Sequence, residues 1–152
     1  MTMKHFFLFA TFSVLLLSYC NSVGAQSVKE VWSDMPDSVM PLLTRNNRLD
    51  CIDYWEAGQQ GDVKNRLDGA VSIHYMSEDS LCVSDTPSSR YEMSLRRDKA
   101  GAVSAIVVRR VVTGTMTDWT ERTYSPSWHI IAEKAAPTAA FEEQLLKGVR
   151  MM

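Results

Sequence analysis

One run of residues constrains the fold more than any other part of this 152-residue chain. Residues 102–113, AVSAIVVRRVVT, are the longest β-branched stretch in the sequence. A strand with one face in water alternates apolar and polar residues, so apolar residues on both faces predict a central strand that is covered from both sides. As a strand, this run carries Val103, Ala105, Val107 and Val111 on one face, and Ile106, Val108 and Val112 on the other.

The first 25 residues have the pattern of a signal peptide. Lys4 precedes an uncharged apolar run at 6–17, and small residues at 23–25 offer a cleavage site after Ala25. The apolar run is shorter than the ~20 residues that span a bilayer, so we expect an exported protein with no membrane span after cleavage. A lipoprotein anchored at Cys20 is the weaker alternative, because Tyr19 is bulky where a lipobox needs a small residue.

The remaining residues, 26–152, are enough for a single domain. Removing 25 residues from 152 leaves 127, and the loss of Lys4 leaves 15 basic against 18 acidic residues. This balance lacks the basic footprint typical of nucleic-acid binding. We therefore expect no nucleic-acid partner. The signal-peptide pattern, in turn, predicts a periplasmic or envelope-associated location.

Helical patterns precede and follow the predicted strands. Ser27 and Glu30 form a capping box that predicts a helix ending before Pro36, and a second helix is expected at about 47–57. A short C-terminal helix at 139–152 is expected to pack on the second face of the central strand through Phe141, Leu145 and Val149.

Period-two patterns between these helices predict the sheet. Strands are expected at 63–67, 70–76, 81–84, 90–96, 102–113 and 118–124, with Asp68 and Gly69 as a hairpin turn. The prediction is an α+β domain, in which N-terminal helices pack on an antiparallel meander of about five to six strands and a short helix closes the chain.

Few residues outside the targeting segment suggest catalysis. The mature chain contains no GxSxG, HExxH, P-loop, GxGxxG or CxxC pattern. Cys51 or Cys82 could act as a nucleophile with His74 as the base, as in a thiol hydrolase. The other interpretations are two inert buried thiols or a disulfide, and a histidine, His74 or His129, that is simply exposed.

One acidic helix face raises the question of a metal. Asp50, Asp53 and Glu56 recur at three-residue spacing, but a hard cation needs six to eight oxygen ligands and no DxDxDG loop is present. A solvated helix face explains these residues, so we expect no metal and no cofactor.

Late aromatic residues and one arginine pair are the candidates for ligand binding. Trp119, Tyr124 and Trp128 could stack on a sugar or a peptide, or could fill the core. Arg109 and Arg110 could fork onto a carboxylate or phosphate, or could mark where the central strand emerges into solvent.

Residues 35–58, MPDSVMPLLTRNNRLDCIDYWEAG, resemble the N-terminal signature of a family of secreted Bacteroidales proteins of unknown function, DUF3256. Weaker similarity continues to Tyr124 and Trp128. The resemblance implies secretion but assigns no activity. The resemblance also predicts that this chain is truncated, because family members extend some tens of residues further. Some members carry cysteines near the positions of Thr113 and Thr117.

Two classes of function remain. The first is a non-enzymatic binding module of the cell envelope, which binds a protein partner, an envelope ligand or a second copy through the sheet face around residues 102–112, with Phe141, Leu145 and Val149 at the rim. This prediction follows because one short helix is little cover for a sheet. The second is a small thiol-dependent hydrolase that uses Cys51 or Cys82 with His74.

Overall fold

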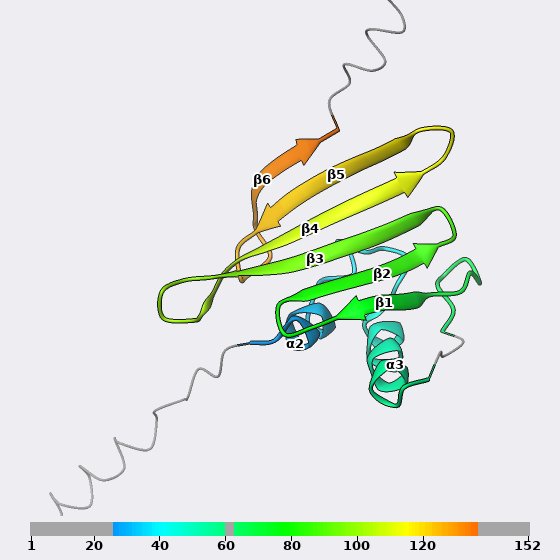
Figure 1. Cartoon of the computed structure of the whole chain (residues 1–152), viewed down its shortest axis with the longest axis horizontal. Coiled ribbons are helices and arrows are strands. Elements are labelled where there is room, and N and C mark those ends of the chain that lie inside the picture. The colour runs from blue at the N-terminus through cyan, green and yellow to red at the C-terminus, as the bar shows by residue number, and fades with distance from the viewer. Residues whose placement is uncertain (1–25, 60–62, 137–152) are drawn as a thin grey trace, which may run out of the picture.

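The structure is a computed structural model that describes residues 26–59 and 63–136. Two helices precede six strands in the described part of the chain (Figure 1). The predicted signal peptide at 1–25 and the predicted helix at 139–152 lie outside the described residues. The elements are α2 (Val28–Ser33), α3 (Arg45–Glu56), β1 (Ser72–Met76), β2 (Ser80–Thr86), β3 (Ser89–Arg97), β4 (Val103–Thr113), β5 (Thr117–Tyr124) and β6 (Ile130–Ala135).

The six strands form one antiparallel sheet in which spatial order equals chain order, β1-β2-β3-β4-β5-β6. Each strand therefore pairs with the strand before it and the strand after it, as Figure 1 shows. The longest strand, β4, lies between β3 and β5. This arrangement confirms the α+β class, the antiparallel meander and the interior position predicted for residues 102–113.

Both helices begin with a capping box. In α2 the Ser27 hydroxyl accepts from the Glu30 N–H, and a Glu30 carboxylate oxygen accepts from the Ser27 N–H at 2.9 Å. In α3, Thr44 and Asn47 exchange the same pair of bonds, with N–H to oxygen distances of 3.2 and 3.3 Å. Each box satisfies two N–H groups that the first helical turn leaves without a partner.

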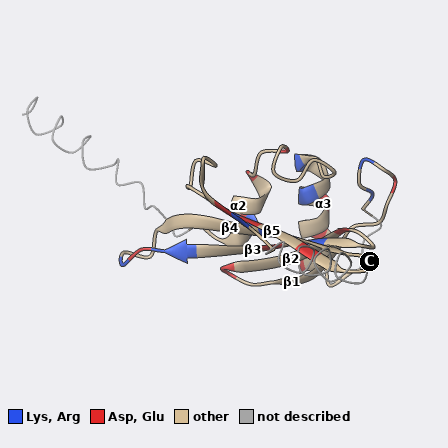
Figure 2. Ribbon diagram, turned by 90° about the horizontal axis from the view of Figure 1, so that it is seen from above, with Lys and Arg blue, Asp and Glu red and all other residues tan. Residues whose placement is uncertain are grey.

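Both helices lie on one side of the sheet (Figure 2). The core between them and the sheet is built from one face of each inner strand. Trp32 of α2, which is 1 % exposed, and Ile52 of α3 are fully buried in this cluster. The strands contribute Leu81, Val83, Tyr91, Met93, Leu95, Ile106, Val108 and Tyr124.

One buried arginine joins α3 to the segment before it. Arg48 is 0 % exposed. Its Nη1 donates to the Asp37 carboxylate at 2.9 Å and to the Leu43 carbonyl at 3.0 Å, and its Nη2 donates to the Met35 carbonyl. A guanidinium can serve three acceptors at once because its five N–H groups fan out in one plane. Arg48 thereby fixes the turn-rich segment between α2 and α3.

Two details of the predicted sheet are wrong. Residues 63–67 form only an isolated bridge, between Lys64 and Ala70, because the Asn65 side chain accepts from the N–H groups of Leu67 and Gly69 and folds the segment into a turn. The sixth strand is β6, which the sequence analysis did not assign. A turn in which Trp128 has φ +65° leads from β5 into β6.

Candidate functional site

The sheet has a second face, turned away from α2 and α3, which we call the open face. No helix of the described residues crosses it (Figure 2). Because adjacent strands pair in register, side chains on this face form rows that run across the strands. In one row, each residue is the direct cross-strand partner of the next, from β1 to β6: Tyr75, Cys82, Glu92, Arg109, Glu121 and Lys134.

The last four residues of this row carry charges, and we call them the charged row: Glu92, Arg109, Glu121 and Lys134. Their signs alternate along β3, β4, β5 and β6. Arg109 donates to one Glu121 carboxylate oxygen from Nη2 at 2.7 Å and from Nε at 3.1 Å. Glu92 accepts from the Nε of Arg90 at 2.9 Å. Ion pairs within the sheet therefore order three members of the charged row: Glu92, Arg109 and Glu121.

Trp119 lies beside the charged row. It is the cross-strand partner of Val111, and the Arg109 guanidinium is 5.0 Å from the centroid of its indole ring. A guanidinium over an indole is a favourable cation–π contact. Trp119 and Arg109, which are separate candidates in the sequence, thus form one stacked unit.

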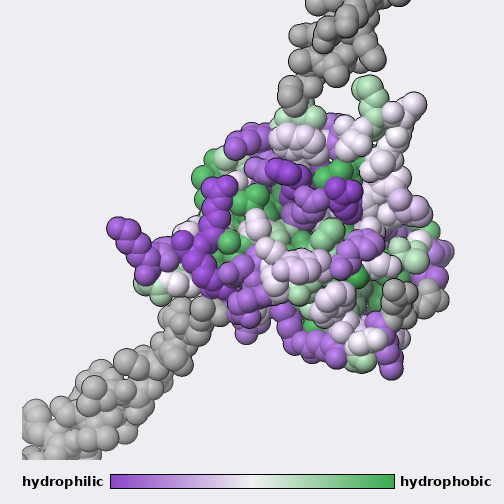
Figure 3. Space-filling model, viewed as in Figure 1, coloured by the Kyte–Doolittle hydropathy of each residue, from purple (hydrophilic) through white to green (hydrophobic). Residues whose placement is uncertain are grey.

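Val107 and Val111 lie on this open face, yet they are only 8 % and 5 % exposed. The long side chain of Arg109 on the same strand, and those of Glu121 and Trp119 on β5, lie beside them and can shield them with their apolar parts. Figure 3 shows hydrophilic residues spread over this face, with hydrophobic ones between them. The second side of the central strand is thus covered in large part by the sheet's own side chains.

A shallow groove runs next to the charged row. It has a volume of about 350 Å³, and Ser80, Ser94 and Val107 form part of its wall together with Glu92 and Arg109. Ser80, Ser94 and Val107 are the first three residues of a row of small side chains across the sheet, so a flat partner can approach the sheet closely there. In register, this row reads Ser80, Ser94, Val107, Thr123, Ala132.

The other three candidate binding residues lie on the helix side of the sheet. Tyr124 is buried in the core, and its ring packs on that of Trp128 with centroids 5.4 Å apart and planes at 59°. The guanidinium of Arg110 is 5.8 Å from the ring centroid of Tyr91. The structure therefore separates the predicted aromatic cluster and the predicted arginine pair across the two faces of the sheet.

Residues that sequence reasoning missed complete the open face. Glu92, Glu121 and Lys134 are unremarkable charged residues in the sequence, and only the strand register brings them into line with Arg109. Alternation within each strand could have placed Glu92 and Glu121 on a wet face. Lys134 carried no signal, because β6 itself was not predicted.

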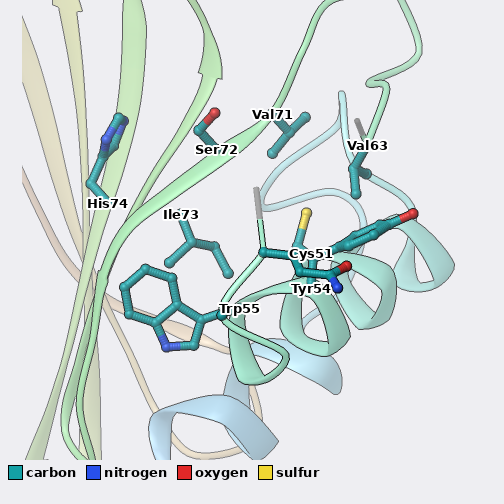
Figure 4. Close-up of a pocket in the computed structure, with 10 residues that line it drawn as sticks. Cys51, Tyr54, Trp55, Val63, Val71, Ser72, Ile73 and His74 are labelled. Carbon is teal, nitrogen blue, oxygen red and sulfur yellow. The ribbon is translucent and has the colours of Figure 1, made fainter. Parts of the chain in front are cut away.

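A separate cleft of about 430 Å³ lies between α3 and β1 (Figure 4). Its walls include Tyr54, Trp55, Ile73 and His74, and the Cys51 sulfur points into it. The described residues that line it include no Asp, Glu, Lys or Arg. The cleft can hold an apolar group, but it supplies little chemistry.

The geometry that a thiol hydrolase requires is missing from the described residues. Burial, and to a lesser extent the charge of Asp50, raises the pKa of Cys51 to about 12. His74 Nε2 instead hydrogen-bonds to the Ser84 hydroxyl at 2.6 Å, and His129 Nδ1 to the Ser127 hydroxyl at 3.1 Å. Within residues 26–59 and 63–136, neither thiol is hydrogen-bonded to a histidine. A nucleophilic thiol needs a lowered pKa and a base within hydrogen-bond reach.

The second thiol is no better suited. Burial and the charge of Glu92 raise the pKa of Cys82, and Arg90 offsets this only in part. Cys51 and Cys82 are both free thiols. Cys51 lies in the core on the helix side and Cys82 lies in a row of the open face, so the sheet separates them.

The acidic face of α3 does not converge on one point. Glu56 forms an ion pair with Lys29 of α2. Within residues 26–59 and 63–136, no group of three or more His, Cys, Asp or Glu side chains could hold a metal ion. None of the helices described there has the length and apolar character needed to cross a membrane.

Fold and surface together define a class: an α+β protein with a six-stranded antiparallel meander, two helices on one face and a charged, aromatic open face. The chain belongs to the family described as protein of unknown function (DUF3256), whose model matches residues 20–149. This match confirms the resemblance seen at residues 35–58. No curated protein and no solved structure matches the chain.

Proposed function

We propose that this protein is an exported, non-enzymatic interaction module of the cell envelope, and that it binds through the open face of its sheet. The observation that carries this proposal is the open face itself, which no described helix covers and which presents an ordered row of charges beside an indole. Export rests on the signal-peptide pattern of residues 1–25.

The order of the open face supports a role in binding. Free lysine and arginine side chains lose rotamer entropy when a partner immobilises them. Arg109 has already lost part of that freedom, because it is held by Glu121 and stacked on Trp119. Alternating charges then favour partners with the opposite pattern and disfavour others. The surface is thus suited to selective recognition of a charged, flat partner.

A photo-crosslinking experiment tests the contact surface. Thr123 lies on the open face and Thr120 lies on the same strand, β5, but on the helix side. We replace each in turn by benzoylphenylalanine in the full chain, expressed in a bacterium that exports it. The proposal expects a discrete adduct from position 123 and none from position 120. Equal labelling from both positions, or none from either, would contradict it.

Export has its own test. Mass spectrometry of the exported protein should find Gln26 at the N-terminus, since cleavage after Ala25 is expected. A diacylated Cys20 would instead make the protein a lipoprotein and would leave the proposal for the open face unchanged.

A further inference from the structure

The charged row is self-complementary. Read from β3 to β6 its signs are negative, positive, negative, positive, as set by Glu92, Arg109, Glu121 and Lys134. Read in reverse, the order is positive, negative, positive, negative. A row with an even number of alternating charges therefore matches its own reversed copy, charge against opposite charge.

Only one kind of symmetric stacking uses this property. When two copies stack face to face, the two-fold axis lies between the sheets and parallel to them. If the axis follows the charged row, Glu92 faces Glu92 of the other copy and like charges meet. If the axis runs parallel to the strands, midway between β4 and β5, the row is reversed. Glu92 then faces Lys134, and Arg109 faces Glu121.

The same axis matches the neighbouring rows. On one side of the charged row, Val111 of one copy meets Trp119 of the other, because these two residues are register partners on β4 and β5. On the other side, the row of small residues meets itself, with Val107 against Thr123. The small residues allow the sheets to approach, and the indole gains an apolar contact. Packing of two sheets with nearly parallel strands is a common arrangement.

We propose that the partner of the open face is a second copy of this chain, stacked face to face about a two-fold axis parallel to β4 and β5. This inference rests on the proposed function and names its partner. Strands β3 to β6 cover about 19 Å across the sheet and paired strands of this length run for about 27 Å, so each copy buries about 500 Å². That is below the ~800 Å² per partner of a standard interface, so the dimer is weak and forms at high local concentration.

The test is sedimentation velocity of the 26–152 form with charge-reversal variants. The wild-type protein should form dimers at micromolar to millimolar concentration, and raising NaCl from 50 to 500 mM should weaken dimerisation at least tenfold, because exposed charge pairs are screened. Glu92→Lys and Lys134→Glu should each weaken it at least tenfold, because each places two pairs of like charges in contact.

Mixing the two variants provides the decisive measurement. In a mixed dimer, Lys at position 92 of one copy faces Glu at position 134 of the other, and the second such contact is wild type. An equimolar mixture should therefore dimerise about as well as the wild type, even though neither variant does so alone. This rescue does not depend on effects within one copy, and thermal unfolding verifies that each variant is folded.

Glu133→Lys is the matched control, because Glu133 lies on the helix side of β6, where it pairs with Arg122 at 3.0 Å. It should leave dimerisation within about twofold of the wild type. A wild-type protein that stays monomeric at 1 mM in 50 mM NaCl, or a mixture no better than either variant alone, overturns the proposal. A Thr123 cross-link to a protein of different mass would then leave the proposed function intact with another partner.

Discussion

Ile106 and Val112 lie on the same side of β4, six residues apart, in opposite environments. Ile106 is 1 % exposed in the core beneath the helices, whereas Val112 is 37 % exposed at the far end of the strand. We expect Ile106→Asp to lower the free energy of unfolding by about 4 kcal/mol or more, because it buries a carboxylate without a partner. Val112→Asp should cost less than about 1 kcal/mol.

Equilibrium unfolding in urea measures both values on proteins of the same length and net charge. Similar losses for the two variants would mean that the helices do not cover the middle of β4.

Cys51 makes the stability of the fold depend on alkaline pH. Its pKa is raised from 9.0 to about 12, chiefly by burial. Below pH 9 the thiol is protonated in both states and has no effect. Between pH 9 and 12 the unfolded chain releases this proton while the folded chain keeps it, so stability falls as pH rises. By pH 10 the loss from this group is about 1 kcal/mol.

The measurement is the free energy of unfolding at pH 8 and pH 10 for the wild type and for Cys51→Ala. Because Tyr91 and Cys82 also have raised pKa values, both proteins should lose stability, but the variant should lose less. The same loss in both would show that the Cys51 thiol is not buried in the folded protein.

At the scale of elements, the sequence was most informative where one local pattern decides the structure. The capping box at Ser27 is a four-residue signal, and α2 begins where it predicts. The strand β4 was found because its apolar residues are consecutive, and β3 because its residues alternate. In each case the element is fixed by interactions among its own residues or by the packing of its apolar residues in the core.

Elements that depend on distant partners were missed. All six residues of β6 are exposed, so no apolar pattern distinguishes this strand, and only pairing with β5 creates it. The opposite error occurred at residues 63–67, where a strand was predicted and none forms. They carry a strand-like pattern, but Asn65 donates to the Asp85 carbonyl on β2 and holds a turn in place of a ladder.

The capping box of α3 gives a prediction at this scale. Thr44→Ala removes the hydroxyl that accepts from the Asn47 N–H, and should lower the free energy of unfolding by about 1 kcal/mol. Thr44→Ser keeps the hydroxyl and should remain within about 0.5 kcal/mol of the wild type. Urea unfolding followed by circular dichroism compares the three proteins. Equal losses in the two variants would assign the effect to the Thr44 methyl group.

For the molecule as a whole, the candidate site could be predicted only in part. Trp119 and Arg109 were selected by chemistry, since large aromatic and guanidinium groups are common contact residues. That they stack on each other, and that Arg110 and Tyr124 lie on the opposite face, follows from strand register. Register is a long-range property, which the sequence of any one strand does not contain.

The gradient of burial across the sheet predicts a gradient of local stability. Inner strands β3 and β4 bury core residues, whereas β6 is an exposed edge strand with Ile130 57 % and Ile131 61 % exposed. Amide hydrogens of Val107 and Val108 should exchange slowest, near the rate set by global unfolding, and those of β6 should exchange fastest. Hydrogen exchange with mass spectrometry, at a concentration where the protein is monomeric, measures this. Equal protection of β4 and β6 would show that the edge strand is covered.

The strands have the same order in the sheet as in the chain, and this order affects how the protein folds during synthesis or translocation. Every strand contacts its predecessor across a short turn, so the pairing steps close small loops and the folding barrier is correspondingly low for a sheet of this size. A polypeptide that emerges N-terminus first, from a ribosome or a translocation channel, presents α2 and α3 first and then adds one strand at a time. Each new strand pairs with the strand made just before it, so the growing edge of the sheet moves from strand to strand and comes to rest at β6.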